Sequence, residues 1–140
     1  MISAYQSLLA FLRQELVLLT RISDLTKQIE VQSRQAEIRL EDLPERRQVY
    51  IDRLKKCRRA AARSLAELPA PQRARAEALL AGRAVGPALG GEERELLESA
   101  GSCRAVLRKT LASDVSARGK IRAECARLRS LVRAARSARQ

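Results

Sequence analysis

The chain has 140 residues, and 28 Lys and Arg against 16 Asp and Glu give it a formal net charge of +12. It contains one Phe, two Tyr, no Trp and no His. Ala, Glu, Leu, Lys and Arg supply 84 residues, a bias typical of long helices and coiled coils. Because a compact globular core usually includes large aromatic side chains, we expect one elongated all-α domain over residues 1–140, packed by aliphatic residues.

The positive charge is concentrated in the last two thirds of the sequence. Residues 1–44 contain five basic and six acidic side chains, whereas residues 45–140 contain 23 basic and ten acidic ones. Such a field attracts nucleic acids, anionic membranes or acidic proteins. However, 23 of the 28 basic residues are Arg, which a GC-rich genome would produce without selection for binding. The sequence leaves both interpretations open.

The three cysteines, Cys57, Cys103 and Cys125, lie too far apart to suggest a metal or redox motif. Each falls on an apolar helical stripe, so we expect buried, reduced thiols, as in a cytoplasmic protein. The first residues lack the basic region of a secretory signal, and the apolar run 16–19 is too short to cross a bilayer. We expect no metal and no cofactor.

The first helix is predicted over residues 3–42. Ser3 and Gln6 have the spacing of a capping box. Phe11, Val17 and Leu18 widen the apolar stripe, so this helix should contact two neighbours or a dimer mate. Pro44 interrupts the pattern, and the sequence leaves open whether it marks a kink or a turn. The stripe itself consists of Tyr5, Leu8, Leu9, Leu12, Leu16, Leu19, Ile22, Leu25 and Ile29.

A second helix is predicted over residues 45–68, followed by a short helix over 72–81 and a flexible loop over 82–91. Pro69 and Pro71 end the second helix, and the loop contains four glycines and a proline. One face of the second helix is an apolar seam, made by Tyr50, Leu54, Cys57, Ala61, Leu65 and Leu68. The other face is interpreted as solvated and basic, with Arg46, Arg47, Arg53, Lys55, Lys56, Arg58, Arg59 and Arg63.

The last predicted helix, over residues 92–138, is long and amphipathic. Its stripe of apolar or small residues would extend for roughly 70 Å at about 1.5 Å per residue, and such a stripe requires a helical partner. Acidic residues in its first turn and arginines near its end support one continuous helix, whereas Gly101 and Gly119 leave a local break open. Asp114 either sets register against a partner or lies at the edge of the stripe, and we favour the edge. The stripe comprises Leu96, Ala100, Cys103, Leu107, Leu111, Ile121, Cys125, Leu128, Val132 and Ala135.

The sequence contains no arrangement that indicates catalysis. It has no His, no Walker-type phosphate loop and no serine elbow between glycines, so we do not expect an enzyme. The basic clusters could contact phosphates, but no aromatic platform, helix-turn-helix or zinc site accompanies them, which disfavours nucleic acid. Membrane insertion is also disfavoured, because the last helix has Ala and Cys where insertion requires Phe, Trp or Leu.

The arrangement resembles the FlgN and FliT type flagellar export chaperones of the bacterial type III pathway. The matching stretches are residues 5–12 (YQSLLAFL) with Glu15-Leu16, residues 40–54 (LEDLPERRQVYIDRL) and the terminal amphipathic helix. The resemblance implies an elongated antiparallel helical bundle or coiled-coil-like hairpin with a long C-terminal helix. Chaperones of this type are commonly acidic, whereas this chain is basic.

The resemblance also implies a function. Such a cytoplasmic chaperone holds the helical end of a hook-associated or filament-cap protein and delivers it to an export-gate component. The residues that would form the partner-binding face are Leu107, Leu111, Ile121, Cys125, Leu128 and Val132. The alternatives are a basic coiled-coil protein, structural or associated with nucleic acid, and a self-assembling homodimer without a substrate.

Overall fold

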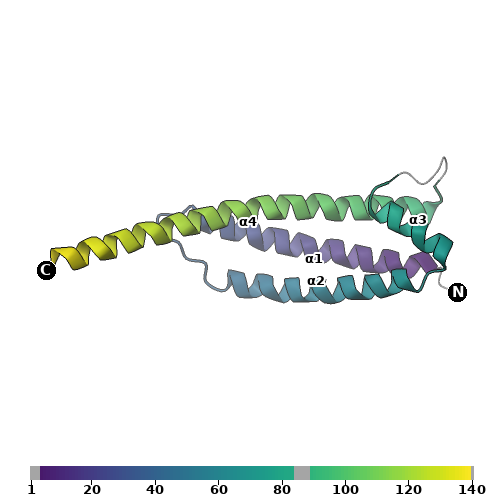
Figure 1. Cartoon of the computed structure of the whole chain (residues 1–140), viewed down its shortest axis with the longest axis horizontal. Helices are drawn as coiled ribbons and strands as arrows, with labels where there is room; N and C mark the ends of the chain where they lie inside the picture. The colour runs from purple at the N-terminus through teal and green to yellow at the C-terminus, as the bar shows by residue number, and fades with distance from the viewer. Residues whose placement is uncertain (1–3, 84–88, 140) are drawn as a thin grey trace.

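The computed structural model describes residues 4–83 and 89–139, which form four helices and no strand (Figure 1). The helices are α1 (Ala4–Ser33), α2 (Leu43–Ala66), α3 (Ala70–Leu80) and α4 (Gly91–Ala138). The all-α bundle expected from composition and periodicity is confirmed.

α1 is the central helix of the bundle. It packs against both α2 and α4, running antiparallel to α2 and in the same direction as α4 (Figure 1). Among the described residues, no Cα atom of α2 lies within 8 Å of a Cα atom of α4. The wide apolar stripe of α1 predicted contact with two neighbours or a dimer mate. Within the chain α1 contacts two helices, although the side chain of Val17 is 54% exposed and lies outside the core.

The core is aliphatic and divides into two clusters along α1. The first cluster lies where α3 covers one end of the bundle, and it joins Leu8, Leu9, Leu12, Leu68, Ala76, Leu79 and Leu96. The second joins Leu18, Leu19, Ile22, Leu54, Cys57 and Cys103. Both clusters draw on three or more segments of the chain, so their burial fixes the helices against one another.

α1 ends at Ser33, so the prediction of a helix extending to residue 42 was wrong. The Ser33 hydroxyl donates to the Glu30 carbonyl at 2.6 Å, and the Arg34 amide donates to the Val31 carbonyl in a tightened last turn. Residues 34–42 are almost all exposed, so no burial stabilises further helix there.

The chain turns before Pro44 rather than kinking there. Glu41 has a φ of 52°, and α2 begins at Leu43 with the proline in its first turn, where a missing amide costs nothing.

α3 ends in a Schellman motif. Gly82 has a φ of 77°, its amide donates to the Leu79 carbonyl, and the Arg83 amide donates to the Ala78 carbonyl. A Cβ atom at Gly82 would lie 2.9 Å from the Arg104 guanidinium. Glycine therefore suits this position because of both its positive φ and its small size. The predicted loop over 82–91 includes residues 84–88, which lie outside the described residues, as does the predicted helix start at Ser3.

α4 is one continuous helix of 48 residues, and neither Gly101 nor Gly119 breaks it. Its last buried residue is Ala117. The remainder, residues 118–138, is called the distal segment below, and it extends beyond the ends of α1 and α2 (Figure 1). Cys125 lies there and is exposed, so the prediction that it is buried was wrong. The physical reason is that α1 ends at Ser33 and offers no surface to cover it.

Candidate functional site: a groove between α2 and α4

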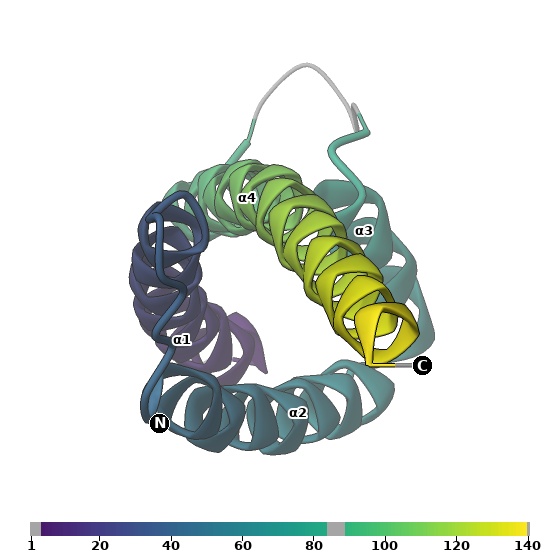
Figure 2. The ribbon, with the colours of Figure 1, turned by 90° about the vertical axis from the view of Figure 1, so that its left-hand side faces the viewer.

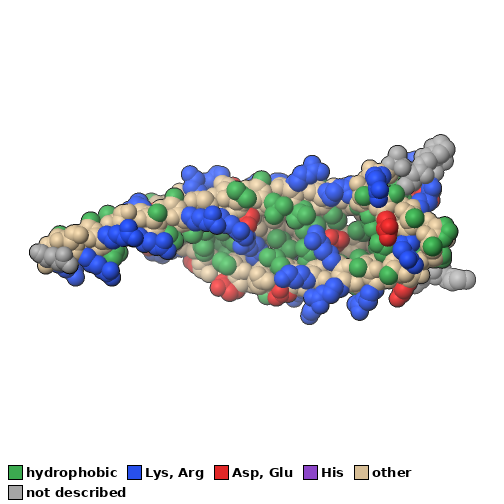
Figure 3. Space-filling view, viewed as in Figure 1, with side chains coloured by type: hydrophobic (Ala, Val, Ile, Leu, Met, Phe, Trp, Pro, Cys, Tyr) green, Lys and Arg blue, Asp and Glu red, His purple; other side chains and the backbone are tan. Residues whose placement is uncertain are grey.

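An apolar groove lies between α2 and α4, with α1 as its floor. It exists because both helices pack on α1 without packing on each other. Viewed along the molecule, α1, α2 and α4 occupy three sides of a square. The fourth side is open except at the end farther from the viewer, where α3 lies, and the distal segment of α4 extends toward this side at the end nearer to the viewer (Figure 2). Figure 3, viewed from that open side, shows apolar side chains between the two helices and basic side chains along both.

Two depressions follow one another along the groove, and Leu107 lines both of them. The depression nearer to α3 has a volume of about 390 Å³, and the second has a volume of about 200 Å³. The first is lined by Leu8, Leu12, Glu15, Arg58, Ala61, Ala62, Leu65, Leu80, Ala81, Ala100, Cys103, Arg104 and Leu107. The second is lined by Leu19, Ile22, Thr26, Arg47, Ile51, Leu54, Leu107, Thr110, Leu111, Asp114 and Arg118.

Two thiols approach consecutive carbonyls of α1 from opposite sides of the groove. Cys57 Sγ of α2 lies 3.2 Å from the Phe11 carbonyl oxygen, and Cys103 Sγ of α4 lies 3.8 Å from that of Leu12. Burial is the main reason that the pKa of both thiols is raised, to about 11 for Cys103, and the nearby Glu15 carboxylate adds to the effect. Both thiols are therefore protonated at neutral pH and act as small apolar groups with weak S–H donors.

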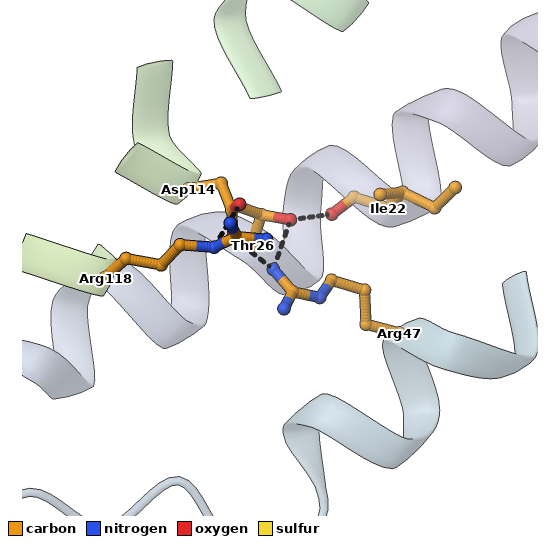
Figure 4. Close-up of polar contacts among 5 residues, drawn as sticks. All are labelled: Ile22, Thr26, Arg47, Asp114 and Arg118. Carbon is orange, nitrogen blue, oxygen red and sulfur yellow. Dashed lines mark hydrogen bonds and ion pairs between the residues drawn. The ribbon is translucent and has the colours of Figure 1, made fainter. Parts of the chain in front are cut away.

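A polar cluster crosses the far end of the groove (Figure 4). Arg47 of α2 donates to the Asp114 carboxylate of α4 at 2.9 Å and to the buried Thr26 hydroxyl of α1 at 3.3 Å. Arg118 contacts the other carboxylate oxygen of Asp114 at 2.9 Å. The Thr26 hydroxyl in turn donates to the Ile22 carbonyl at 2.7 Å. These bonds join all three long helices at one level.

A second charged pair joins α2 to the groove floor, because Arg58 contacts the Glu15 carboxylate at 2.7 Å. Both Arg47 and Arg58 were assigned to a solvated face, which was wrong for Arg47, whose side chain is 21% exposed, whereas Arg58 remains exposed while it makes its contact. The arginine side chain is long enough to reach inward from the border of the apolar seam. Asp114 lies at the border of the stripe, where its side chain is only 17% exposed and contacts both Arg47 and Arg118.

The six predicted partner-binding residues fall into two groups. Leu107 and Leu111 line the groove, and Leu111 is 54% exposed. The other four lie on the distal segment, where Ile121 is partly buried and Cys125, Leu128 and Val132 are exposed.

The apolar patterns of α1 and α2 do not reveal which of their residues line the groove, such as Leu12, Ala61 and Leu65. Their periodicity indicates burial but not which neighbour is missing. The width of the α1 stripe gives no signal for the groove, because Phe11, Val17 and Leu18 line neither depression.

The described residues contain no group of three or more side chains suited to holding a metal ion. Within those same residues, none of the helices combines the length and the apolar character needed to cross a bilayer. Comparison of the chain with protein-family models, with curated protein sequences and with solved structures finds no match.

Proposed function

We propose that this chain is a cytoplasmic export chaperone of the FlgN and FliT type, which holds an amphipathic helix of a flagellar hook-associated or filament-cap protein before secretion. The supporting observation is the apolar groove between α2 and α4. A helix placed there would contact α1, α2 and α4 together and would complete a four-helix bundle.

The groove suits a helix better than it suits a compact ligand. Its two depressions are open, follow one another and share Leu107, so they accept side chains that repeat along an axis. Packed helix axes lie about 8–10 Å apart, and the apolar side chains of a partner at positions i, i+3, i+4 and i+7 would enter successive depressions.

The unliganded chain keeps the groove open through interactions of its own. The Arg47–Asp114 contact ties α2 to α4 at one end. At the other end, α3 packs between them, contacting both α4 and α2. A binding site held open in this way loses less conformational entropy when the partner docks.

The direct test is binding of the isolated helical termini of hook-associated and filament-cap proteins by the purified full-length chain. Leu111→Asp places a charge in the groove at a half-exposed position and should abolish binding without unfolding the bundle. Val17→Asp is the matched control, because Val17 has the same 54% exposure but lines neither depression of the groove. Binding that is absent in the native chain, or equal in both variants, would contradict the proposal.

A second pair of variants asks whether the distal segment takes part. Ile121→Asp and Leu128→Asp together disturb only the apolar stripe beyond the bundle. If the partner helix extends past the groove, this double variant weakens binding less than Leu111→Asp does, because the groove buries more of the partner. Stronger weakening by the distal variant would place the binding site on the distal segment instead.

A further inference from the structure

The distal segment of α4 is strongly basic. Residues 118–138 include seven basic side chains and one acidic one, Glu124. Glu124 is already engaged by Arg127 at 2.6 Å, and Arg118 is engaged by Asp114. The remaining positive charge of the segment has no acidic counterpart on the helix itself.

Four of these arginines form one row. Arg122, Arg129, Arg133 and Arg136 follow at intervals of seven, four and three residues, which keeps them on one face of a helix. All four are exposed, and none has an ion pair within the described parts of the chain. These four residues are called the arginine row.

The arginine row continues the side of α4 that faces the groove. Leu111 lies eleven residues before Arg122, about three helical turns, and Arg104 lies eighteen residues before it, about five turns. All three residues therefore lie on nearly the same face of α4. Both Leu111 and Arg104 line the groove. The distal segment also extends toward the open side of the groove (Figure 2). A helix that lies in the groove and extends past its end therefore meets the arginine row.

The charge of the row selects among possible occupants. A second copy of α4 would bring the same positive charge and be repelled. Nucleic acid would match the charge but would make no use of the apolar stripe beside it, in which Leu128 and Val132 are exposed and Ile121 is partly buried. An acidic amphipathic helix satisfies both features, since its carboxylates pair with the arginines and its apolar face covers the stripe.

We propose that the partner is an acidic amphipathic helix, whose apolar stretch occupies the groove and whose acidic stretch lies along the arginine row. This inference rests on the proposed helix-binding function and specifies the chemistry of the partner. It assigns the basic charge of the distal segment to recognition rather than to genome composition. The acidic side chains of the partner would speed its association with this chain and would fix the direction in which the partner helix lies along the groove.

The test uses fluorescein-labelled peptides of about 36 residues, which at about 1.5 Å per residue match α4 from Ala100 to Arg136. Every peptide has a leucine stripe at helical spacing. In one series, the remaining positions of one half of the peptide are Glu, and in the other series the same positions are Gln. Each peptide is made in two versions, with this half at the N-terminus or at the C-terminus. Binding to the full-length chain is measured by anisotropy at roughly 50 mM and 200 mM salt.

We expect the better-oriented Glu peptide to bind roughly tenfold more tightly than its Gln counterpart at low salt, as several exposed ion pairs would produce. Arg122→Gln, Arg129→Gln, Arg133→Gln and Arg136→Gln together should abolish this advantage. The control makes the same charge change on the outer, exposed face of α2, with Lys55→Gln, Lys56→Gln, Arg59→Gln and Arg63→Gln. This control variant should still bind the Glu peptide more tightly than the Gln peptide, with most of the difference retained.

The outcomes separate this inference from the proposed function. If Glu and Gln peptides bind equally and Leu111→Asp weakens both, the groove proposal stands and the acidic partner is wrong. If neither peptide binds, or the control variant acts as strongly as the row variant, the acidic partner is also wrong. A duplex DNA titration completes the test, because DNA binding that depends on the row while the peptides are indifferent to it would identify a phosphate-binding surface instead.

Discussion

The two parts of α4 have the same kind of sequence but different surroundings. In residues 91–117 α1 covers most of the apolar stripe, with Leu96, Ala100 and Cys103 buried, and Leu111, at the groove, is the exposed exception. In the distal segment the stripe continues with the same period, yet Leu128 and Val132 remain about half exposed. Periodicity therefore indicates a helix face that needs to be covered, whereas the length of the neighbouring helix decides how much of that face the chain covers itself.

The largest difference between the two parts should appear in stability. Leu96→Ala removes a side chain with no exposed surface and should lower the free energy of unfolding by about 2–5 kcal/mol. Leu128→Ala, at 48% exposure, should change it by less than about 0.5 kcal/mol. Urea unfolding followed by circular dichroism measures both. Equal losses would mean that the distal stripe is covered within the isolated chain.

The reactivity of the three thiols should show the same difference between the buried bundle and the exposed distal segment. Cys125 is exposed and should react with iodoacetamide in the native protein at pH 8, whereas Cys57 and Cys103 should react only when the bundle opens. Because burial raises the pKa of Cys103 to about 11, its thiolate is scarce at pH 8 as well. Mass spectrometry should show labelling of Cys125 at least roughly a hundredfold faster. Rapid native labelling of Cys103 would contradict the packing described for α4 on α1.

The polar cluster around Asp114 lies at the boundary between the two parts of α4, and its disruption should have a smaller effect on the free energy of unfolding. Arg47→Gln leaves Asp114 with Arg118 alone and unties α2 from α4, so it should cost about 1–2 kcal/mol of stability, between the values for exposed and buried pairs. Arg46→Gln, on the exposed neighbour, is the control and should have no measurable effect. If the two variants unfold at the same urea concentration, the cluster does not join the helices in solution.

The smallest effect concerns the glycine near the boundary. A Cβ at Gly119 would meet nothing within 4 Å, so Gly119→Ala should stabilise this part of α4 by about 0.5–1 kcal/mol. Since the distal segment is stabilised by few tertiary contacts, the gain should appear as slower amide hydrogen exchange around residues 115–125 rather than as a higher global melting temperature. Unchanged exchange there would indicate that glycine does not limit the local helix.

The sequence predicts the bundle well because aliphatic residues at helical spacing allow few alternatives. It fails where a long-range partner decides the outcome. Residues 34–42 have weak helical periodicity that nothing covers, so the helix ends at Ser33, and that early end leaves Cys125 exposed. Arg47 has the local pattern of a surface residue, but a carboxylate 67 positions away draws it inward. Local sequence patterns do not predict the groove either, because it forms where α2 and α4 both pack on α1 without packing on each other.

Methyl NMR of the Leu and Val side chains, recorded with and without the helical terminus of a hook-associated or filament-cap protein, shows whether a partner helix occupies the groove. The groove account predicts that the methyl signals of Leu107 and Leu111 shift most and that those of Val17 and Val49, on other faces of α1 and α2, stay in place. Shifts confined to Val17 and Val49, or no shift at saturating partner, would contradict it.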